Sequence, residues 1–579
     1  MTAVDFIIIL LYFIGLLVLG GVLSRRIKSS EDMFVAGKNS SWWLSGLSTY
    51  MTIFSAGTFV VWGGVAFRSG LVTVVIGMML GIASFIVGKY VVRKWVDMGI
   101  KSPGEYIRFR FSESAFRFYT IVGIIGRAIH MAVALYAIAI MVVALIPLPA
   151  GHILADASTG HLSIVYAVLI MGAITIVYTA AGGFVSVLMT DVVQFAVLFG
   201  MVVIMMPLSF NSIGGIQEFI HKAPAGFFHL SSARYSWGWL ILWCILNIFI
   251  IGGDWSFVQR FISVPNAKQA KYSTYLVGVL YLVTPIIWYI PSMVYRIIDP
   301  SADPEQSYML MSQHILGPGM VGMMLAAMIS ATLSTVSGTL NVFASVFTND
   351  IFKVLRPQAT EKKLIFVGRA FTYGFGLVIT VLGILIPHFG GAEKIVVSIM
   401  TLIISPLFIP SLWGLFSKKI GTKSIWLAMG TTYALGLLVK FDIINAFDSV
   451  SSELLDALIG LVLPVTILTL LEVFGKASET EPGWEELQQR IARETTLVTQ
   501  PTAEEQDMTH KSTLVYSTMA FKIMMGTYAS IGTIMAILAI MATAPSEQHK
   551  LLLFATIFLV VPGICYLIYW SRTRKSRSS

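Results

Sequence analysis

The sequence predicts an all-α protein that crosses a membrane about fifteen times. Of its 579 residues, 56% are hydrophobic and 12% are charged, and the mean hydropathy is +0.81. A soluble protein of this size does not need so much apolar sequence, whereas many of these apolar runs are close to the ~20 residues that span a bilayer as a helix. Two of the runs are interrupted near their middle by glycine and polar residues.

The chain consists of apolar runs joined by mostly short polar loops. The first run carries Asp5 and has no lysine or arginine before its apolar part. A cleaved signal peptide has a basic N-terminal region, so this run is expected to be a retained span. The expected spans cover residues 4–23, 44–66, 71–92, 116–146, 162–180, 184–208, 236–258, 272–296, 317–347, 365–387, 394–416, 424–440, 453–474, 516–543 and 550–571.

Lysine and arginine alternate between the loops in phase with this count. Basic residues gather in every second loop and in the tail, at Arg25, Arg26, Lys28, Arg93, Lys94, Lys101, Arg260, Lys268, Lys271, Lys353, Arg356, Lys362, Lys418, Lys419, Lys423, Arg572, Arg574 and Lys575. Basic loops are retained in the cytoplasm. The pattern therefore predicts a multi-pass protein of the plasma (cytoplasmic or inner) membrane, with its N-terminus outside and its C-terminus inside.

The two interrupted runs are Thr52–Phe59 and Ile250–Trp255. A break at membrane depth frees backbone amides and carbonyls, which lipid cannot satisfy, so the broken segment must face protein or a wet cavity. Paired breaks in the two halves of a chain indicate the binding site of a transporter.

Small and hydroxyl-bearing residues dominate Leu325–Gly338. One interpretation is close helix packing, because small residues let backbones approach each other. The other is an alkali-cation site, since Ser334 and Thr335 offer hard oxygen atoms that the carbonyl of Ala331 could join. The remaining ligands would come from the break near Met51–Ser55.

Single polar residues in other spans have functional or structural interpretations. Asp191 is either a functional carboxylate or lies close enough to the end of its helix to reach cytoplasmic water. Asn247 is either a ligand of the solute or an interhelical hydrogen-bonding group, and Asp254 lines an inner vestibule, holds a gate or pairs with a nearby base. His130 is expected to be an interior histidine with its hydrogen bonds satisfied.

Several classes of function are excluded. Cys244 and Cys565 lie far apart in apolar runs and form no disulfide framework or metal motif. The sequence has no P-loop, no His/Cys metal cluster and no nucleophile with a base, so neither ATP-driven transport nor an enzyme is expected. The connection 475–515 is expected to be a linker with one amphipathic surface helix near Trp484–Ile491, and a regulatory role for it is the alternative.

The chain resembles the sodium:solute symporter family, in its sodium/sugar cotransporter branch. The resemblance covers about residues 1–475. The segments that carry it, in order, are Ser30–Lys38, Ser55–Phe59, Tyr178–Gln194, Val258–Arg260, Ala326–Asn341, Phe347–Ile351 and Gly414–Lys419.

This resemblance implies a ten-helix core made of two inverted five-helix repeats, whose first and sixth helices are discontinuous. The expected parts are an extra N-terminal helix and loop at 1–43, the first repeat at 44–208, the second at 236–416, peripheral helices at 424–474, the cytoplasmic linker at 475–515, and C-terminal helices with a basic tail at 516–579.

The resemblance also implies a sodium site and no other cofactor. Its expected ligands are the carbonyls of Met51, Phe54 and Ala331 and the hydroxyls of Ser334 and Thr335. Some members of the family have a second sodium site. Asp191, Ser334 and Ser337 match it, but Gly338 stands where another hydroxyl is expected.

The expected solute site lies midway across the membrane. By rough alignment its residues are Thr58, Gly77, Asn247, Asp254, Trp255, Tyr281 and Ser398. The acid, lysine and glutamine that surround the sugar in familiar members of the family are absent. Asn247 with nearby aromatic side chains still favours a sugar or sugar derivative.

The predicted function is sodium-coupled import of this small polar solute. The partners are therefore the solute, Na⁺ and membrane lipid, with no nucleic acid and no obligate protein partner. The alternatives are a sodium symporter for a carboxylate such as sialic acid or another monocarboxylate, a proton-coupled transporter that uses Asp191 or Asp254, and a solute sensor that transports nothing.

Overall fold

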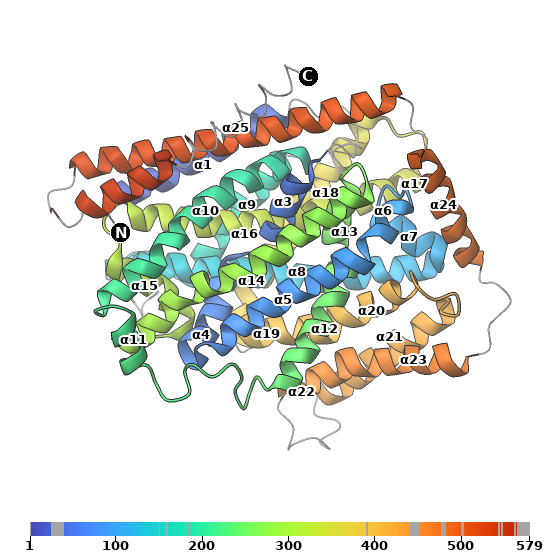
Figure 1. The fold of residues 1–579 in the computed structure, drawn as a ribbon, viewed down its shortest axis with the longest axis horizontal. Helices are drawn as coiled ribbons and strands as arrows, with labels where there is room; N and C mark the ends of the chain where they lie inside the picture. Colours follow the sequence, from blue (N-terminus) through green and yellow to red (C-terminus); the bar gives the residue numbers. More distant parts are fainter. Residues whose placement is uncertain are drawn as a thin grey trace.

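The computed structural model describes residues 2–24, 40–149, 151–156, 160–181, 184–389, 392–440, 452–475, 482–499, 503–541, 545, 548–560 and 563. Within this part of the chain every named element is a helix. Figure 1 shows the long helices lying side by side and running in a common direction. Some residues singled out in the sequence lie outside the described residues, namely Arg25, Arg26, Lys28, the Ser30–Lys38 segment, residues 182–183 within Tyr178–Gln194, Cys565 and the basic tail from Arg572.

The centre of the molecule contains two successions of helices that follow the same order, each starting with a broken helix. The first succession comprises α3 (Trp42–Ile53), η2 (Thr58–Trp62), α4 (Gly63–Ser69), α5 (Val72–Tyr90), α8 (Glu113–Leu145), α9 (Ile164–Ala181) and α10 (Phe184–Ser212). The second comprises α12 (Trp237–Gly253), α13 (Trp255–Ile262), α14 (Ala267–Ile298), α16 (Met320–Ser345), α18 (Glu361–Leu385), α19 (Ala392–Ile399), η6 (Met400–Ile404) and α20 (Ser405–Trp413).

Other helices connect these or lie around them. The connecting helices are α6 (Val92–Asp97), α7 (Pro103–Arg110), α11 (Ile216–Lys222), η3 (Pro304–Gln306), α15 (Ser307–Ile315), η4 (Val346–Phe352), α17 (Lys353–Leu355) and η5 (Ile386–Phe389). The peripheral helices are α1 (Ala3–Ser24), α21 (Thr422–Lys440), α22 (Ser452–Ala457), η7 (Leu458–Val462), α23 (Leu463–Phe474), α24 (Pro482–Thr499) and α25 (Ala503–Met541).

The lengths and compositions of the helices fit a protein with many membrane spans. In the described residues, nine helices are long and apolar enough to cross a membrane, or up to 11 if each bent pair is one span. Shorter apolar helices at Ala3–Leu16, Ile164–Ala180 and Gln548–Val560 coincide with three further expected spans. The expected span 424–440 is the helix α21, which is in neither group, so the count of fifteen remains a prediction.

Helix α16 lies in the middle of the core, and every one of its residues is buried. Its small side chains allow several helices to pack closely around it. The N-terminal helix α1 lies against it, because the Asp5 carboxylate accepts hydrogen bonds from the amides of Gly319 (2.7 Å) and Gly322 (2.8 Å). A carboxylate at a helix N-terminus satisfies amides that have no partner within the helix. Asp5 therefore anchors α1 at the start of α16.

The first broken helix bends by 60° between α3 and η2. The amides freed at this break find hydroxyl partners, with Ala56 N donating to Thr332 Oγ1 (3.1 Å) and Ser55 N donating to Thr58 Oγ1 (3.4 Å). Since Ser55 N no longer bonds within the helix, the carbonyl of Met51, four residues earlier, is released from its usual partner.

The second broken helix bends by 53° between α12 and α13, at Asp254. Asp254 Oδ1 accepts from the amide of Ser256 at 2.8 Å and so caps α13. The carbonyl of Gly252 accepts from the indole Nε1 of Trp95 at 2.8 Å. A Cβ atom at Gly253 would lie 3.0 Å from Phe408 Cβ, so the glycine lets α20 approach the break closely. Both breaks therefore occur where the sequence predicted them.

Helix α24 packs against α7 at the end of the bundle that also contains α6 and α17 (Figure 1). The side chain of Leu487 is fully buried there. Arg490 Nη1 lies 2.7 Å from Glu105 Oε1, and the guanidinium of Arg110 lies 5.5 Å from the centre of the Trp484 ring. The surface helix expected within the 475–515 connection is thus docked on the helical core.

Leu487→Ser is expected to release α24 from α7, because removing a buried leucine side chain costs about 2 kcal/mol or more. Trypsin should then cleave after the exposed Arg493 several times faster than in the wild type. Gln488→Ser, one residue away and exposed, serves as the control. Equal cleavage rates in the two variants would show that Leu487 does not hold the helix.

Candidate functional site

The structure brings together four of the five groups that the sequence predicted as sodium ligands. Thr335 Oγ1 lies 2.8 Å from Phe54 O, 3.2 Å from Met51 O and 3.2 Å from Ala331 O. A threonine hydroxyl has one proton and can donate to one of these carbonyls at a time. Because the carbonyl oxygens outnumber the protons available to them, the cluster is an electron-rich cage that suits a monovalent cation.

The fifth group, the hydroxyl of Ser334, is oriented by a buried carboxylate. Ser334 Oγ donates to Asp191 Oδ1 at 2.6 Å, and Ser48 Oγ donates to Asp191 Oδ2 at 2.5 Å. Asp191 is completely buried. A hydroxyl that gives its proton to a carboxylate keeps its lone pairs for a cation, so Asp191 acts on the cage through Ser334.

A small pocket adjoins the first break. The volume accessible to a water-sized sphere is about 50 Å³. Its lining comes from the broken helix, from α8 and from α19, and consists of Ile53, Ser55, Gly57, Thr58, Val61, Trp62, His130, Val133, Ala134 and Val396. The ring of His130 faces this pocket, and its Nδ1 has no hydrogen-bond partner among the described residues. The expectation of a fully satisfied interior histidine therefore differs from the structure.

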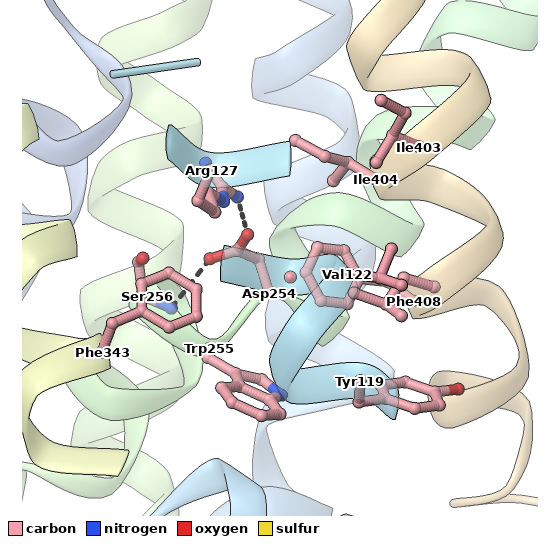
Figure 2. Close-up of a pocket in the computed structure, with 12 residues that line it drawn as sticks. Tyr119, Val122, Arg127, Asp254, Trp255, Ser256, Phe343, Ile403, Ile404 and Phe408 are labelled. Atoms are coloured by element: carbon pink, nitrogen blue, oxygen red, sulfur yellow. Dashed lines mark hydrogen bonds and ion pairs between the residues drawn. The ribbon is translucent and has the colours of Figure 1, made fainter. Parts of the chain in front are cut away.

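A second pocket adjoins the other break. Figure 2 shows that the Arg127 guanidinium from α8 meets the Asp254 carboxylate, with the rings of Trp255 and Tyr119 below the pair. Both charged side chains are at least nine-tenths buried, with exposed fractions of 8% for Arg127 and 2% for Asp254. The volume accessible to a water-sized sphere is about 10 Å³, which is room for about one water molecule.

The predicted solute residues do not all meet in one place. Thr58 lines the first pocket, and Asp254 and Trp255 line the second. The other four lie in packing contacts elsewhere. Asn247 Nδ2 donates to Trp243 O at 2.8 Å, Ser398 Oγ donates to Asp456 Oδ2 at 2.8 Å, the Tyr281 ring lies 4.8 Å from the Tyr50 ring, and a Cβ at Gly77 would lie 2.8 Å from Pro285 Cγ.

Sequence reasoning missed three contributors to these sites. Arg127 was not recognised as the partner of Asp254, although an arginine inside the expected span 116–146 is a signal of function. Ser48 had no signal, because serines are common in packed membrane helices. His130 was noticed but assigned a structural role, since an isolated histidine does not show which pocket it faces.

The comparisons with known proteins agree with this arrangement. The model of the sodium:solute symporter family matches residues 33–429, which is more than half of the chain. The chain belongs to the sodium:solute symporter family. The broken helices and the oxygen cage of this symporter lie within the matched residues.

Relatives of the symporter include cotransporters of sugars and polyols. It is 25% identical over 449 residues to a sodium/glucose cotransporter of Vibrio parahaemolyticus, covering 72% of this chain and 80% of the relative. It is 27% identical over 486 residues to the human sodium/myo-inositol cotransporter 2, covering 75% of this chain and 69% of the relative.

The fold matches that of a solved symporter. The structure of a Na⁺-coupled sialic acid symporter, in a substrate-bound outward-open state, superposes with a TM-score of 0.69 at 19% identity. The match covers 83% of this chain and all of that one. At this identity the likeness establishes the fold alone.

Proposed function

We propose that the symporter couples the inward movement of sodium to the import of a small neutral polyol or sugar. The observation that carries this proposal is the placement of Thr335 Oγ1 within 3.2 Å of three carbonyl oxygens, two of them freed by the break in α3–η2. Membership of the family and the names of its relatives support sodium coupling and a polyhydroxylated solute.

Sodium binds among the carbonyl oxygens of Met51, Phe54 and Ala331 and the hydroxyls of Thr335 and Ser334. Since these ligands come from both the broken helix and α16, the ion stabilises the conformation in which the two helices are held together. Coupling arises if the solute prefers the same conformation, because tight binding alone does not shift an equilibrium between two states.

The two successions of helices form inverted repeats around this ion. The support for this is their identical order, each with a broken first helix followed by four spans. We assign the end that contains α6, α7 and α24 to the cytoplasm of the cell and the start of α1 to the outside, in keeping with the distribution of basic loops. The repeats then rock against each other in the plasma membrane to open the site to either side.

The solute binds beside the first break, in the pocket that contains Thr58, Trp62 and His130. These side chains supply a hydroxyl, a stacking surface and an imidazole nitrogen, which suit the hydroxyls and apolar faces of a sugar or inositol. Among the side chains that the structure describes, no lysine, arginine or carboxylate lines this pocket, which favours a neutral solute over a carboxylate such as sialic acid. The present volume of about 50 Å³ requires the helices to separate before a whole sugar can enter.

A thermal-shift screen of the purified chain tests this proposal. Each solute is measured in sodium and in potassium at equal ionic strength, with myo-inositol, glucose, sialic acid and proline as representatives of four classes. A coupled ligand raises the melting temperature more in sodium than in potassium, because the ion and the solute stabilise the same state. Stabilisation by sialic acid but not by the polyols would overturn the neutral-solute assignment, and an identical response in both salts, with a dependence on pH instead, would favour proton coupling.

His130→Ala is expected to weaken solute binding about tenfold and to leave sodium binding unchanged, because His130 faces the solute pocket and touches no oxygen of the cage. The solute concentration for half-maximal thermal stabilisation measures the first effect, and sodium titration without solute measures the second. Thr120→Val serves as the control, since this buried α8 hydroxyl bonds only to Phe116 O of its own helix. A solute affinity that does not change would remove His130 from the site.

A further inference from the structure

The space beside Asp191 contains the guanidinium of Arg260. Both side chains are completely buried. Arg260 Nε donates to Ser48 Oγ at 3.0 Å, Nη1 donates to Ser256 O at 2.9 Å, and Nη2 lies 4.0 Å from Asp191 Oδ2. The arginine on α13 thus reaches across to α3 and α10.

Gly338 makes room for this guanidinium. A Cβ atom at position 338 would lie 2.7 Å from Arg260 Nη2, which is closer than real Cβ atoms approach a neighbour. Any side chain at this position on α16 would therefore displace the guanidinium. The glycine stands where the sequence lacks a hydroxyl that a second sodium site would need.

The other hydroxyls around this space already donate hydrogen bonds to acceptors within the protein. Ser337 Oγ donates to Ser334 O of its own helix at 3.3 Å, while Ser334 and Ser48 both donate to Asp191. One buried negative charge on Asp191 thus faces one buried positive charge on Arg260. A second free cation beside the guanidinium would meet an uncompensated repulsion in a region of low dielectric constant.

We propose that the Arg260 guanidinium takes the place of a second sodium ion, so that the symporter binds one sodium ion per cycle. This inference rests on the proposed function and fixes its ion stoichiometry. The arginine neutralises Asp191, and the carboxylate remains available to orient the Ser334 hydroxyl toward the single bound ion. Gly338 is the residue that permits this arrangement.

Equilibrium binding of ²²Na⁺ to the purified full-length chain tests the inference without knowledge of the solute. The wild type is expected to bind one sodium ion per chain with a Hill coefficient of about 1. Thr335→Ala is expected to weaken this binding by tenfold or more, so that little sodium is bound at the concentration that half-saturates the wild type, because Thr335 contacts all three carbonyl ligands of the cage.

The double variant Arg260→Gln with Gly338→Ser is designed to create the second site. It removes the buried positive charge and adds a hydroxyl on α16 facing Asp191, and it is expected to bind two sodium ions per chain. Arg260→Gln with Gly338→Ala keeps the Cβ atom at position 338 but lacks the hydroxyl, and it is expected to bind the second ion at least tenfold more weakly. Adding Asp191→Asn to the double variant should return the count to one.

Three outcomes are distinguishable. Two sodium ions bound to the wild type would overturn the inference and leave the proposed function intact, whereas no bound sodium would overturn the proposed function itself. A double variant that elutes as a folded monodisperse protein and still binds one ion would also overturn the inference. If that variant fails to fold, the wild-type count, together with the weaker sodium binding of Thr335→Ala, still decides between one site and two.

Discussion

Thr335→Ala is expected to weaken sodium binding by tenfold or more. Its hydroxyl oxygen lies within 3.2 Å of the carbonyl oxygens of Met51, Phe54 and Ala331, so the substitution removes a ligand and leaves the freed carbonyls facing one another. Loss of one such polar partner at a buried site costs about 1–3 kcal/mol, and 1.4 kcal/mol corresponds to a factor of ten in affinity. The measurement is the sodium concentration for half-maximal thermal stabilisation.

Two matched variants separate the effect of losing the hydroxyl ligand from the effect of losing the packing of the side chain. Thr335→Ser keeps the hydroxyl and should retain most of the affinity. Thr339→Ala removes a hydroxyl of the same kind one turn further along α16, where it bonds only to Thr335 O, and should leave sodium binding close to that of the wild type. If Thr339→Ala weakened sodium binding as much as Thr335→Ala, the site would not lie at the oxygen cage.

Among the substitutions described here, neutralising one member of the Arg127–Asp254 pair is expected to lower the thermal stability of the protein most. The pair joins α8 to the start of α13 and is almost completely buried. Removing one partner of a buried ion pair leaves the other charge without compensation, which costs about 3–5 kcal/mol. Arg127→Met should therefore lower the melting temperature strongly, as measured by the fraction that remains monodisperse after heating.

Asp254→Asn isolates the role of the charge from that of the helix cap. Asparagine caps a helix as well as aspartate does, so this variant keeps the hydrogen bond to Ser256 N and loses only the charge. The double variant Arg127→Met with Asp254→Asn should recover most of the stability, because no buried charge is left alone. A double variant whose loss equals the sum of the two single losses would show that the two groups do not interact.

The positions of the two breaks could be predicted from the sequence because glycine and polar residues interrupt apolar runs, and lipid does not tolerate such interruptions. The oxygen cage followed from Ser334 and Thr335 once a partner with freed carbonyls was identified, and the structure places Met51 O and Phe54 O next to Thr335. These features depend on local sequence and on one pairing of helices, which the freed carbonyls near Met51–Ser55 suggest and the family resemblance supports.

The contacts of Arg127, Ser48 and Arg260 could not be predicted in the same way. Each contact depends on the direction in which a side chain points across an interface between two helices. These helices are far apart in sequence, as in the contact of Arg260 with Ser48. The predicted solute residues illustrate the same limit, because the structure divides them between two pockets and packing contacts, and a rough alignment does not fix the direction of a side chain. Asn247 and Ser398, which bond to Trp243 O and Asp456, are placed in this way.

Uptake into proteoliposomes tests most directly whether bound sodium drives transport. The vesicles contain the purified wild-type chain. The tracer is the solute that gives the strongest sodium-dependent rise in melting temperature in the thermal-shift screen. An inward sodium gradient should concentrate the tracer above its external level, and an inside-negative potential should increase this further, by up to ~2.3 kcal/mol per transported charge per 100 mV. Uptake that proceeds equally when potassium replaces sodium, or that is unchanged in Thr335→Ala, would contradict the proposed coupling.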